Sequence, residues 1–304
     1  MANLQASRLF SVQDRVVVIT GGGSGLGRIM ARALDANNVS KVFVLGRRED
    51  ALRETGAQAP NSSVIPVQCD ITSKESLEAA YKTVASQTSH VDLLIANSGI
   101  MGPLMRHPPP AADGTLPSLS AVRDELFSVP MEEFSNVLNV NVTGSYYTVL
   151  AFLPLLEAAN KRRNAPQAGV LSEPTAQVII TSSIAGFIRK VPFSYAYNAS
   201  KSATTHLVKM LATNFAAYDI RFNGISPGLY YSDMADHIFS GAGIKDAGIS
   251  DGSFPRDMIP ATRGGSEEDL AGLILWLASA SGGYVNGNIL VTDGGRLSVV
   301  PAVY

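Results

Sequence analysis

A tyrosine and a lysine four residues apart are the first residues whose types and spacing suggest catalysis. Of the ten tyrosines in the chain, only Tyr197 is followed at this distance by a lysine, Lys201. On a helix this spacing places both side chains on one face. An ammonium group near a phenol stabilises the phenolate and lowers its pKa toward the range of an acid–base catalyst. The pair therefore predicts a tyrosine that exchanges a proton with a substrate.

Ser183 adds weight to this pair, which by itself arises often by chance. The serine follows an apolar run at 177–181, in the segment Thr181-Ser182-Ser183-Ile184-Ala185-Gly186. It precedes Tyr197 by 14 residues, which is a plausible length for a loop that returns to the start of the tyrosine helix. We therefore expect the hydroxyl and the phenol to share one site.

A glycine-rich turn at 21–27, with the sequence Gly-Gly-Gly-Ser-Gly-Leu-Gly, predicts a phosphate-binding site. Glycines permit a tight turn and let the backbone approach a pyrophosphate, and a helix N-terminus presents free N–H groups to an anion. A purely structural turn would look similar. The apolar run before this turn and the helical pattern after it favour dinucleotide binding.

The end of the next apolar run indicates which dinucleotide is bound. An NAD site favours an acidic residue there, whereas an NADP site favours arginine. This chain has Gly46 at that position, followed by Arg47 and Arg48, whose guanidinium groups suit a 2′-phosphate. Alternatively, Glu49 and Asp50 neutralise both arginines at a helix start. We expect the cofactor to be NADP(H).

Short β-branched runs alternate with longer amphipathic stretches along the whole chain. This alternation predicts an α/β, doubly wound Rossmann fold with a central, mostly parallel seven-stranded sheet and helices on both faces. Several runs are apolar almost throughout, as expected of strands covered on both faces. The predicted strands are 16–20, 41–45, 64–68, 92–96, 177–181, 220–225 and 288–291. The predicted helices are 25–35, 74–85, 134–158, 200–217 and 267–279.

The length of 304 residues suggests about two domains, but no repeat or change in composition marks a linker. We therefore predict a single domain over 1–304. Residues 101–130 contain three consecutive prolines and predict a long loop. Residues 160–174 contain a cationic triplet at 161–163 and predict a solvated helix end followed by a surface excursion. Residues 229–260 mix aromatic residues with glycines, which is typical of a substrate lid; an ordinary loop and helix packed on the body is the alternative.

Composition argues against several classes of function. The net charge of −2 argues against a nucleic-acid partner, and no apolar run approaches the ~20 residues that span a membrane. The N-terminus lacks the pattern of a signal peptide, and the lone Cys69 cannot form an internal disulfide, so we expect a cytoplasmic protein. The four histidines show no spacing typical of metal ligands, so we expect no catalytic metal.

Taken together, the motifs resemble those of the short-chain dehydrogenase/reductase family, from about residue 16 to residue 296. Several independent motifs in the right order make this resemblance specific. Within the family the chain looks most like the 3-oxoacyl-[acyl-carrier-protein] reductases, particularly the rhamnolipid-pathway type. The motifs shared with the family are Thr20-Gly21-x-x-x-Gly25-x-Gly27, Cys69-Asp70, Ala96-Asn97-Ser98-Gly99, Asn141-Val142-Thr143-Gly144, Ser183, Tyr197-Asn198-Ala199-Ser200-Lys201, Asn223, Pro227-Gly228 and Asp293-Gly294-Gly295. The likeness to the reductases lies in Tyr195-Ala196-Tyr197, Ser232-Asp233-Met234 with His237, and residues 283–288.

This resemblance implies a role for each catalytic residue. Tyr197 is the general acid in reduction and the base in the reverse direction. Lys201 holds the nicotinamide ribose and lowers the pKa of Tyr197. Ser183 donates a hydrogen bond to the substrate oxygen as charge develops on it. Asn141 anchors a water that relays protons through Lys201; it is preferred to Asn139 because Val-Thr-Gly follows it.

The resemblance also implies the extent of the cofactor site, in which Asp70 and Ile71 flank the adenine while Asn97 and Gly99 line the groove. Where the family usually has a small aliphatic residue and then threonine, this chain has Tyr230 and Ser232. The serine keeps the hydroxyl, while the tyrosine crowds the carboxamide pocket or turns toward the substrate. The expected cofactor-binding residues are Gly21, Ser24, Gly25, Leu26, Gly27, Arg47, Arg48, Asp70, Ile71, Asn97, Gly99, Tyr197, Lys201, Pro227, Gly228, Tyr230 and Ser232.

We therefore expect an NADP(H)-dependent reductase that converts a ketone of a hydrophobic, acyl or polyketide-like substrate of secondary metabolism to a secondary alcohol. The alternatives are oxidation of a secondary alcohol with NADP⁺, non-redox chemistry of the dehydratase or cyclase type, and cofactor sensing. The only expected partners are the small-molecule substrate and a second copy of the chain. Members of the family usually form dimers or tetramers, which implies that 134–158 and 200–217 pack across subunits.

Overall fold

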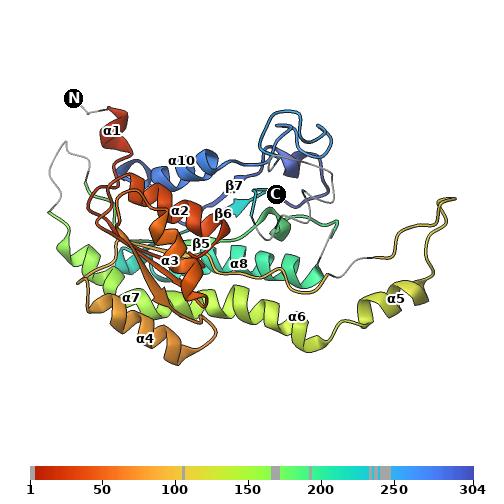
Figure 1. Ribbon diagram of the computed structural model, residues 1–304, viewed down its shortest axis with the longest axis horizontal. Helices are drawn as coiled ribbons and strands as arrows, with labels where there is room; N and C mark the ends of the chain where they lie inside the picture. The colour runs from red at the N-terminus through yellow and green to blue at the C-terminus, as the bar shows by residue number, and fades with distance from the viewer. Residues whose placement is uncertain are drawn as a thin grey trace.

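Seven parallel strands form one sheet in the order β3-β2-β1-β4-β5-β6-β7, with helices on both faces (Figure 1). The computed structural model describes residues 4–104, 107–165, 172–191, 194–232, 235, 239 and 248–304. Every neighbouring pair of strands is parallel, so the α/β, doubly wound fold is confirmed. The strands are β1 (Val16–Thr20), β2 (Lys41–Gly46), β3 (Val64–Gln68), β4 (Leu93–Ala96), β5 (Gln177–Thr181), β6 (Arg221–Pro227) and β7 (Ile289–Thr292).

The helices cover the sheet from both sides because successive strand residues point to opposite faces. Val16 and Val18 pack in one buried cluster with Phe152, while Val17 and Ile19 pack in the other with Met30. The order of the strands reverses between β1 and β4, which is the point where open α/β sheets bind ligands. The α-helices are α1 (Ala6–Leu9), α2 (Gly25–Ala36), α3 (Glu49–Ala57), α4 (Lys74–Ala85), α5 (Leu119–Phe127), α6 (Met131–Leu138), α7 (Ser145–Arg162), α8 (Tyr195–Asn214) and α10 (Glu267–Ala278).

Two of the predicted helices differ from those in the structure. The helix expected at 134–158 begins as α6, passes through a π-helical turn at Asn139–Gly144, and continues as α7. The helix expected at 200–217 begins five residues earlier, because the Ser194 hydroxyl caps it by accepting from the backbone N–H of Tyr197 at 3.3 Å. The early start places Tyr197 in the first turn of α8.

The segment 101–130 is not the uninterrupted loop that the sequence predicts, because it contains helix α5. The Ser118 hydroxyl caps α5 by accepting from the backbone N–H of Ala121 at 3.1 Å. None of the residues of α5 is buried, so the sequence has no apolar period there to reveal the helix. In Figure 1 the segment forms an arm that extends away from the sheet.

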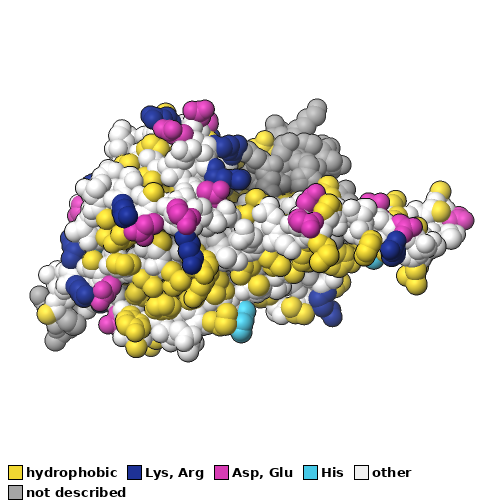
Figure 2. Space-filling view, turned by 90° about the horizontal axis from the view of Figure 1, so that it is seen from below, with side chains coloured by type: hydrophobic (Ala, Val, Ile, Leu, Met, Phe, Trp, Pro, Cys, Tyr) yellow, Lys and Arg dark blue, Asp and Glu magenta, His cyan; other side chains and the backbone are white. Residues whose placement is uncertain are grey.

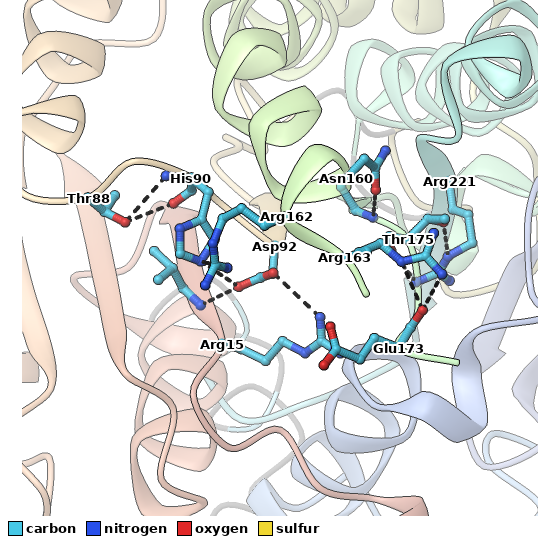
Figure 3. Close-up of polar contacts among 12 residues, drawn as sticks. Arg15, Thr88, His90, Asp92, Asn160, Arg162, Arg163, Glu173, Thr175 and Arg221 are labelled. Atoms are coloured by element: carbon cyan, nitrogen blue, oxygen red, sulfur yellow. Dashed lines mark hydrogen bonds and ion pairs between the residues drawn. The ribbon is translucent and has the colours of Figure 1, made fainter. Parts of the chain in front are cut away.

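A polar cluster joins the amino ends of the central strands to the end of α7 (Figure 3). Asp92 accepts a hydrogen bond from the backbone N–H of Val16 at 2.8 Å, and His90 Nε2 lies 2.7 Å from Arg162 Nη1. Burial lowers the pKa of His90, so a neutral imidazole accepts this bond. The guanidinium of Arg163 donates to the carbonyl of Glu173. Lys161 and Arg162 are exposed, as expected of a solvated triplet, while Arg163 is half-buried. Arg162 and Arg163 in addition hold the end of α7 through these hydrogen bonds.

Candidate active site

A pocket of about 400 Å³ lies at the carboxyl ends of the strands, where the sheet reverses its order. The glycine-rich turn at 21–27, called the phosphate loop below, contributes to its walls. So do the residues that follow β2, β3, β4, β5 and β6. Every predicted site residue lines this pocket except Gly27 and Asn141, which lie immediately behind its walls. The structure thus brings the predicted catalytic and cofactor residues into one place.

The phosphate loop needs glycine at specific positions. Gly21 and Gly25 have φ angles of +66° and +50°, which side chains other than glycine rarely adopt. A Cβ on Gly27 would lie 2.2 Å from the carbonyl oxygen of Gly21, so this glycine lets α2 pack against the loop. The glycines hold the start of α2 close to the floor of the pocket.

The N-terminus of α2 has the features of an anion-binding site. Its N-cap residue, Ser24, makes no capping hydrogen bond, whereas Ser73, Ser118, Ser194 and Ser266 cap their own helices. The first N–H groups of α2 therefore have no side-chain acceptor and point toward the pocket. A pyrophosphate fits this site, because it would accept hydrogen bonds from those groups.

The two arginines after β2 are available to a ligand. Arg48 Nη2 donates a hydrogen bond of 3.3 Å to the Ser24 hydroxyl, beside the start of α2. Glu49 forms its ion pair with Arg53 one helical turn later, at 2.5 Å, rather than with either arginine. Within the described part of the chain, no ion pair neutralises Arg47 or Arg48. The alternative in which the neighbouring acids neutralise them does not describe this structure.

Asp70 and Ile71 lie on the same side of the pocket as Arg47. The backbone and hydroxyl of Thr72 donate hydrogen bonds to Asp70 at 2.9 and 2.7 Å. These bonds, together with the nearby Arg47 guanidinium, lower the pKa of Asp70. Ile71 packs against Gly144 of the π-helical turn, where a Cβ would come within 2.7 Å of its side chain. A flat apolar ring would fit beside these residues.

Asn97 connects β4 to the phosphate loop. Its side-chain amide donates to the carbonyl of Thr20 at 3.1 Å, and its backbone N–H donates to the Thr20 hydroxyl at 3.0 Å. Two residues later, a Cβ on Gly99 would lie 3.2 Å from Asn141 Oδ1 and 3.5 Å from Lys201 Nζ. Glycine at this position keeps the groove open beside the catalytic lysine.

Ser183, Tyr197 and Lys201 come together from two elements. Ser183 follows β5, and its side chain lies close enough to the phenol of Tyr197, in the first turn of α8, to lower the pKa of that phenol. Lys201 lies one turn later, with its Nζ 5.6 Å from the centre of the tyrosine ring. The same Nζ donates a hydrogen bond of 2.8 Å to the carbonyl of Thr181 at the end of β5. The three predicted residues form one constellation.

Burial shifts the pKa values of this constellation in opposite directions. It raises the pKa of Tyr197, and the nearby Ser183 side chain offsets this only in part. It lowers the pKa of Lys201 to about 8. The net shift of the Tyr197 pKa is upward because loss of solvation of the phenolate dominates. That Lys201 lowers this pKa stays a prediction. A phenol that stays protonated near neutral pH suits a proton donor.

Asn141 lies in the π-helical turn and is 1% exposed. Its side chain accepts from the backbone N–H of Ile100 at 2.8 Å and donates to the Ile100 carbonyl and the Ser200 hydroxyl, both at 2.9 Å. Asn139, its competitor in the sequence, is exposed. Asn141 thus clamps the segment after β4 to α8, a positioning role that the sequence did not reveal.

Tyr230 is held in place by a hydrogen bond and by close packing. It is 5% exposed, and its hydroxyl lies 2.6 Å from Thr292 Oγ1. Its ring lies so close to Gly265 that a Cβ there would come within 2.4 Å. The ring is thus packed in the core while the residue also lines the pocket, and its position beside the carboxamide or the substrate stays a prediction. Ser232, by contrast, lies 3.3 Å from where a Cβ on Gly25 would be, beside the phosphate loop.

The described part of the predicted lid has a small core of its own. Phe239, Phe254 and Ile259 are buried together, with the two phenylalanine rings 5.7 Å apart. Phe187 packs edge-on against Tyr304, with the ring centres 5.0 Å apart. Phe193 and His237 lie outside the described residues.

Among the residues that the structure describes, no group of three or more His, Cys, Asp or Glu side chains could hold a metal ion.

Arg296 is a pocket residue that the sequence did not reveal. It follows the Asp293-Gly294-Gly295 motif, lines the pocket and is half-buried, which lowers its pKa. A basic residue directly after a recognised motif was the available signal.

No helix in the described ranges is both long enough and apolar enough to cross a bilayer.

Comparison with known proteins places this site in a family. Residues 15–243 match the family described as short chain dehydrogenase. The short-chain dehydrogenase/reductase PhomF of Diaporthe leptostromiformis is 40% identical over 305 residues, 99% of this chain and 98% of PhomF. The rhamnolipids biosynthesis 3-oxoacyl-[acyl-carrier-protein] reductase of Pseudomonas aeruginosa is 28% identical, over 94% of this chain and 97% of that protein. The solved RhlG/NADP active-site complex of Pseudomonas aeruginosa aligns with a TM-score of 0.74 at 27% identity, over 95% of this chain and 98% of that one. The chain belongs to the short-chain dehydrogenase/reductase family, and it is an oxidoreductase enzyme of that family.

Proposed function

We propose that this enzyme reduces a ketone of a hydrophobic substrate to a secondary alcohol with NADPH. The observation that carries this proposal is the meeting of Ser183, Tyr197 and Lys201 at one wall of the pocket, with the Lys201 Nζ 5.6 Å from the centre of the Tyr197 ring. When bound, NADPH supplies the hydride. Tyr197 donates its proton to the carbonyl oxygen, and Ser183 donates a hydrogen bond to the same oxygen as negative charge develops there.

Lys201 and Asn141 organise the site around this step. The Lys201 ammonium, held by the Thr181 carbonyl, is placed to bind the nicotinamide ribose beside Gly99. The Asn141 amide holds the segment after β4 against α8. This fixes the position of the groove relative to the helix that carries Tyr197 and Lys201. The role of Asn141 as the anchor of a proton-relay water remains a prediction.

The substrate end of the pocket supports a hydrophobic ketone, either acyl or polyketide-like and of the kind found in secondary metabolism. Met101, Ile184, Ile188 and Leu229 line the pocket around the catalytic residues. Apolar walls with few polar groups are typical of sites that bind organic substrates by burial of surface. Oxidation of a secondary alcohol with NADP⁺ would use the same groups in reverse.

The proposal is tested by following cofactor consumption and product formation. The enzyme is supplied with NADPH and a panel of hydrophobic ketones, and separately with NADP⁺ and the corresponding alcohols. We expect consumption of NADPH with stoichiometric formation of alcohol. If the enzyme oxidises the alcohols with NADP⁺ faster than it reduces the ketones, at physiological ratios of NADPH to NADP⁺, the proposed direction of the reaction is wrong. Tight NADPH binding with no turnover of any compound would support a sensing or non-redox protein.

Specificity for NADP(H) is supported by Arg47 and Arg48, and the similar RhlG structure is a complex with NADP. Replacing both arginines by alanine is expected to weaken NADPH binding by about ten- to a hundredfold, because charged hydrogen bonds to a phosphate are lost. NADH binding, which lacks that phosphate, should change little. Fluorescence titration of both cofactors measures the effect. Arg53→Ala is the matched control, since Arg53 pairs with Glu49; equal losses for both cofactors would contradict the assignment.

The pKa of Lys201, about 8, predicts a pH dependence. The ammonium is charged below this pKa and is lost as the pH rises through it. We therefore expect kcat/KM for ketone reduction to fall above about pH 8. Lys201→Arg should move this fall to higher pH, because a guanidinium stays charged. Profiles from about pH 6 to about pH 10 measure both, and a fall that is unchanged in the arginine variant would assign it to another group.

We propose further that the enzyme is a homodimer or homotetramer. Figure 2 shows apolar side chains gathered on the face that carries α4, α6 and α7. Exposed apolar residues of α6, α7 and α8 include Met131, Tyr146 and Met210. Large exposed apolar surfaces mark interaction sites, which supports packing of α7 and α8 across subunits.

A further inference from the structure

Arg296 is a basic side chain of the pocket that the proposed reaction does not use. It begins a short 3-10 turn, Arg296–Ser298, after β7. Burial lowers the pKa of its guanidinium, and the Asp293 carboxylate, acting through space, offsets part of this lowering. No hydrogen bond or close ion pair joins the guanidinium to a residue that the structure describes. The nearest acid along the chain, Asp293, accepts instead from the backbone N–H groups of Gly295 at 2.8 Å and Leu297 at 2.7 Å.

Three other arginines of this chain that are partly or fully buried make hydrogen bonds to protein groups. Arg28 makes a two-pronged contact with Glu54 at 2.9 Å, and Arg263 makes a similar contact with Asp269. Arg221 donates to backbone carbonyls and to Thr175. The guanidinium of Arg296 is half-buried, and with respect to the described residues its five donors stay open to solvent or to a ligand in the pocket. Arg296 is therefore in a position that a ligand would stabilise.

The chain on either side of Arg296 places it near the loop that follows Ser183. Just before it, Asp293 packs on the turn after β6, where a Cβ on Gly228 would lie 2.7 Å from the Asp293 Cα. Just after it, the chain runs to Ala302, which pairs with Ile188 in the loop that follows Ser183. Arg296 thus lies between the Gly228 turn and the loop after Ser183, and not beside Arg47 and Arg48.

We propose that Arg296 binds an anionic oxygen group of the substrate, such as a carboxylate, while Ser183 and Tyr197 hold the ketone. A guanidinium matches the two oxygens of a carboxylate in a fork-shaped contact. This inference rests on the proposed function and narrows its substrate class to hydrophobic ketones that carry an acidic group. The apolar walls hold the carbon skeleton, and Arg296 sets its orientation.

The first test compares keto acids with their methyl esters. The acids vary in the spacing between ketone and carboxylate, and kcat/KM is measured for wild type, Arg296→Met and Arg296→Lys. We expect wild type to prefer at least one acid over its ester by about ten- to a hundredfold. Arg296→Met should abolish this preference. Arg296→Lys should keep part of it, because an ammonium keeps the positive charge but cannot make the two parallel hydrogen bonds of a guanidinium. A preference that is unchanged in Arg296→Met would overturn the proposal.

The second test measures binding without turnover. Benzoate is titrated calorimetrically into the enzyme saturated with NADP⁺, and NADPH affinity is measured for each variant. We expect benzoate binding to be lost in Arg296→Met and retained in the control Arg53→Met, with unchanged NADPH affinity. A loss of NADPH affinity in Arg296→Met would assign the arginine to the cofactor instead. Failure of wild type to reduce any ketone would refute the proposed function, while benzoate binding would still test Arg296.

Discussion

Replacing Tyr197 by phenylalanine is expected to lower kcat/KM for ketone reduction by about 10²- to 10⁴-fold, the range typical of a lost general acid. The substitution removes one hydroxyl and keeps the ring that packs in the first turn of α8. NADPH affinity and thermal stability should therefore change little. Steady-state kinetics on the preferred ketone, with fluorescence titration of NADPH, measure the two effects separately.

Tyr195→Phe is the matched control for this substitution. Tyr195 lies two residues earlier in the same helix, is 38% exposed, and has its hydroxyl 2.8 Å from His107 Nε2. Removing that hydroxyl should leave turnover near the wild-type level. Turnover that persists in Tyr197→Phe would remove the tyrosine from its role as proton donor. Loss of activity in both variants would point to a general effect on the start of α8.

Replacing Gly27 by alanine is expected to weaken cofactor binding by disrupting the packing of the phosphate loop. The added Cβ would lie 2.2 Å from the Gly21 carbonyl oxygen and 2.8 Å from the side-chain nitrogen of Asn97. Neither neighbour can yield easily, because one is backbone and the other is hydrogen-bonded to Thr20. Overpacking of this kind costs about 1–3 kcal/mol. It would also shift the phosphate loop from the start of α2, so NADPH affinity should fall by at least about tenfold.

Gly272→Ala provides the control with the same chemical change in another helix. A Cβ on Gly272, in α10, would meet no atom within 4 Å. Because alanine favours helix by about 1 kcal/mol over glycine, this variant should be slightly more stable than wild type. Thermal unfolding and NADPH titration compare the two variants. Wild-type NADPH affinity in Gly27→Ala would show that the loop tolerates the side chain and would contradict the packing argument.

The elements that carry the strongest local patterns were predicted to within one or two residues. β1 consists of five consecutive buried residues, which produce a continuous apolar run, and glycines with positive φ follow directly. Helix α4 matches its predicted bounds because Ser73 caps it and its buried residues recur at helical spacing. Both signals depend only on neighbours along the chain, so a single sequence contains them.

The helices that were missed have little to bury. Helix α5 has no buried residue, and α3 has only Leu52 and Thr55, so neither produces an apolar period. The π-helical turn that holds Asn141 was also missed, because the hydrogen bonds that use it come from Ile100 and Ser200 far along the chain. Contacts between distant segments leave no regular pattern in a sequence.

By itself, the sequence determined the strand–helix alternation, the glycine loop, and the Ser183, Tyr197 and Lys201 set, since each depends on residue type and short spacing. The tertiary structure alone decided the environment of these groups. The net pKa shift of Tyr197 is upward because burial outweighs the effect of the nearby Ser183 side chain. The hydroxyl of Tyr230 lies against Thr292, and Arg296 lines the pocket without a described partner, because strands and turns remote in sequence meet there. Desolvation and charge pairing depend on which groups surround a residue in space, and this is what spacing along the chain does not specify.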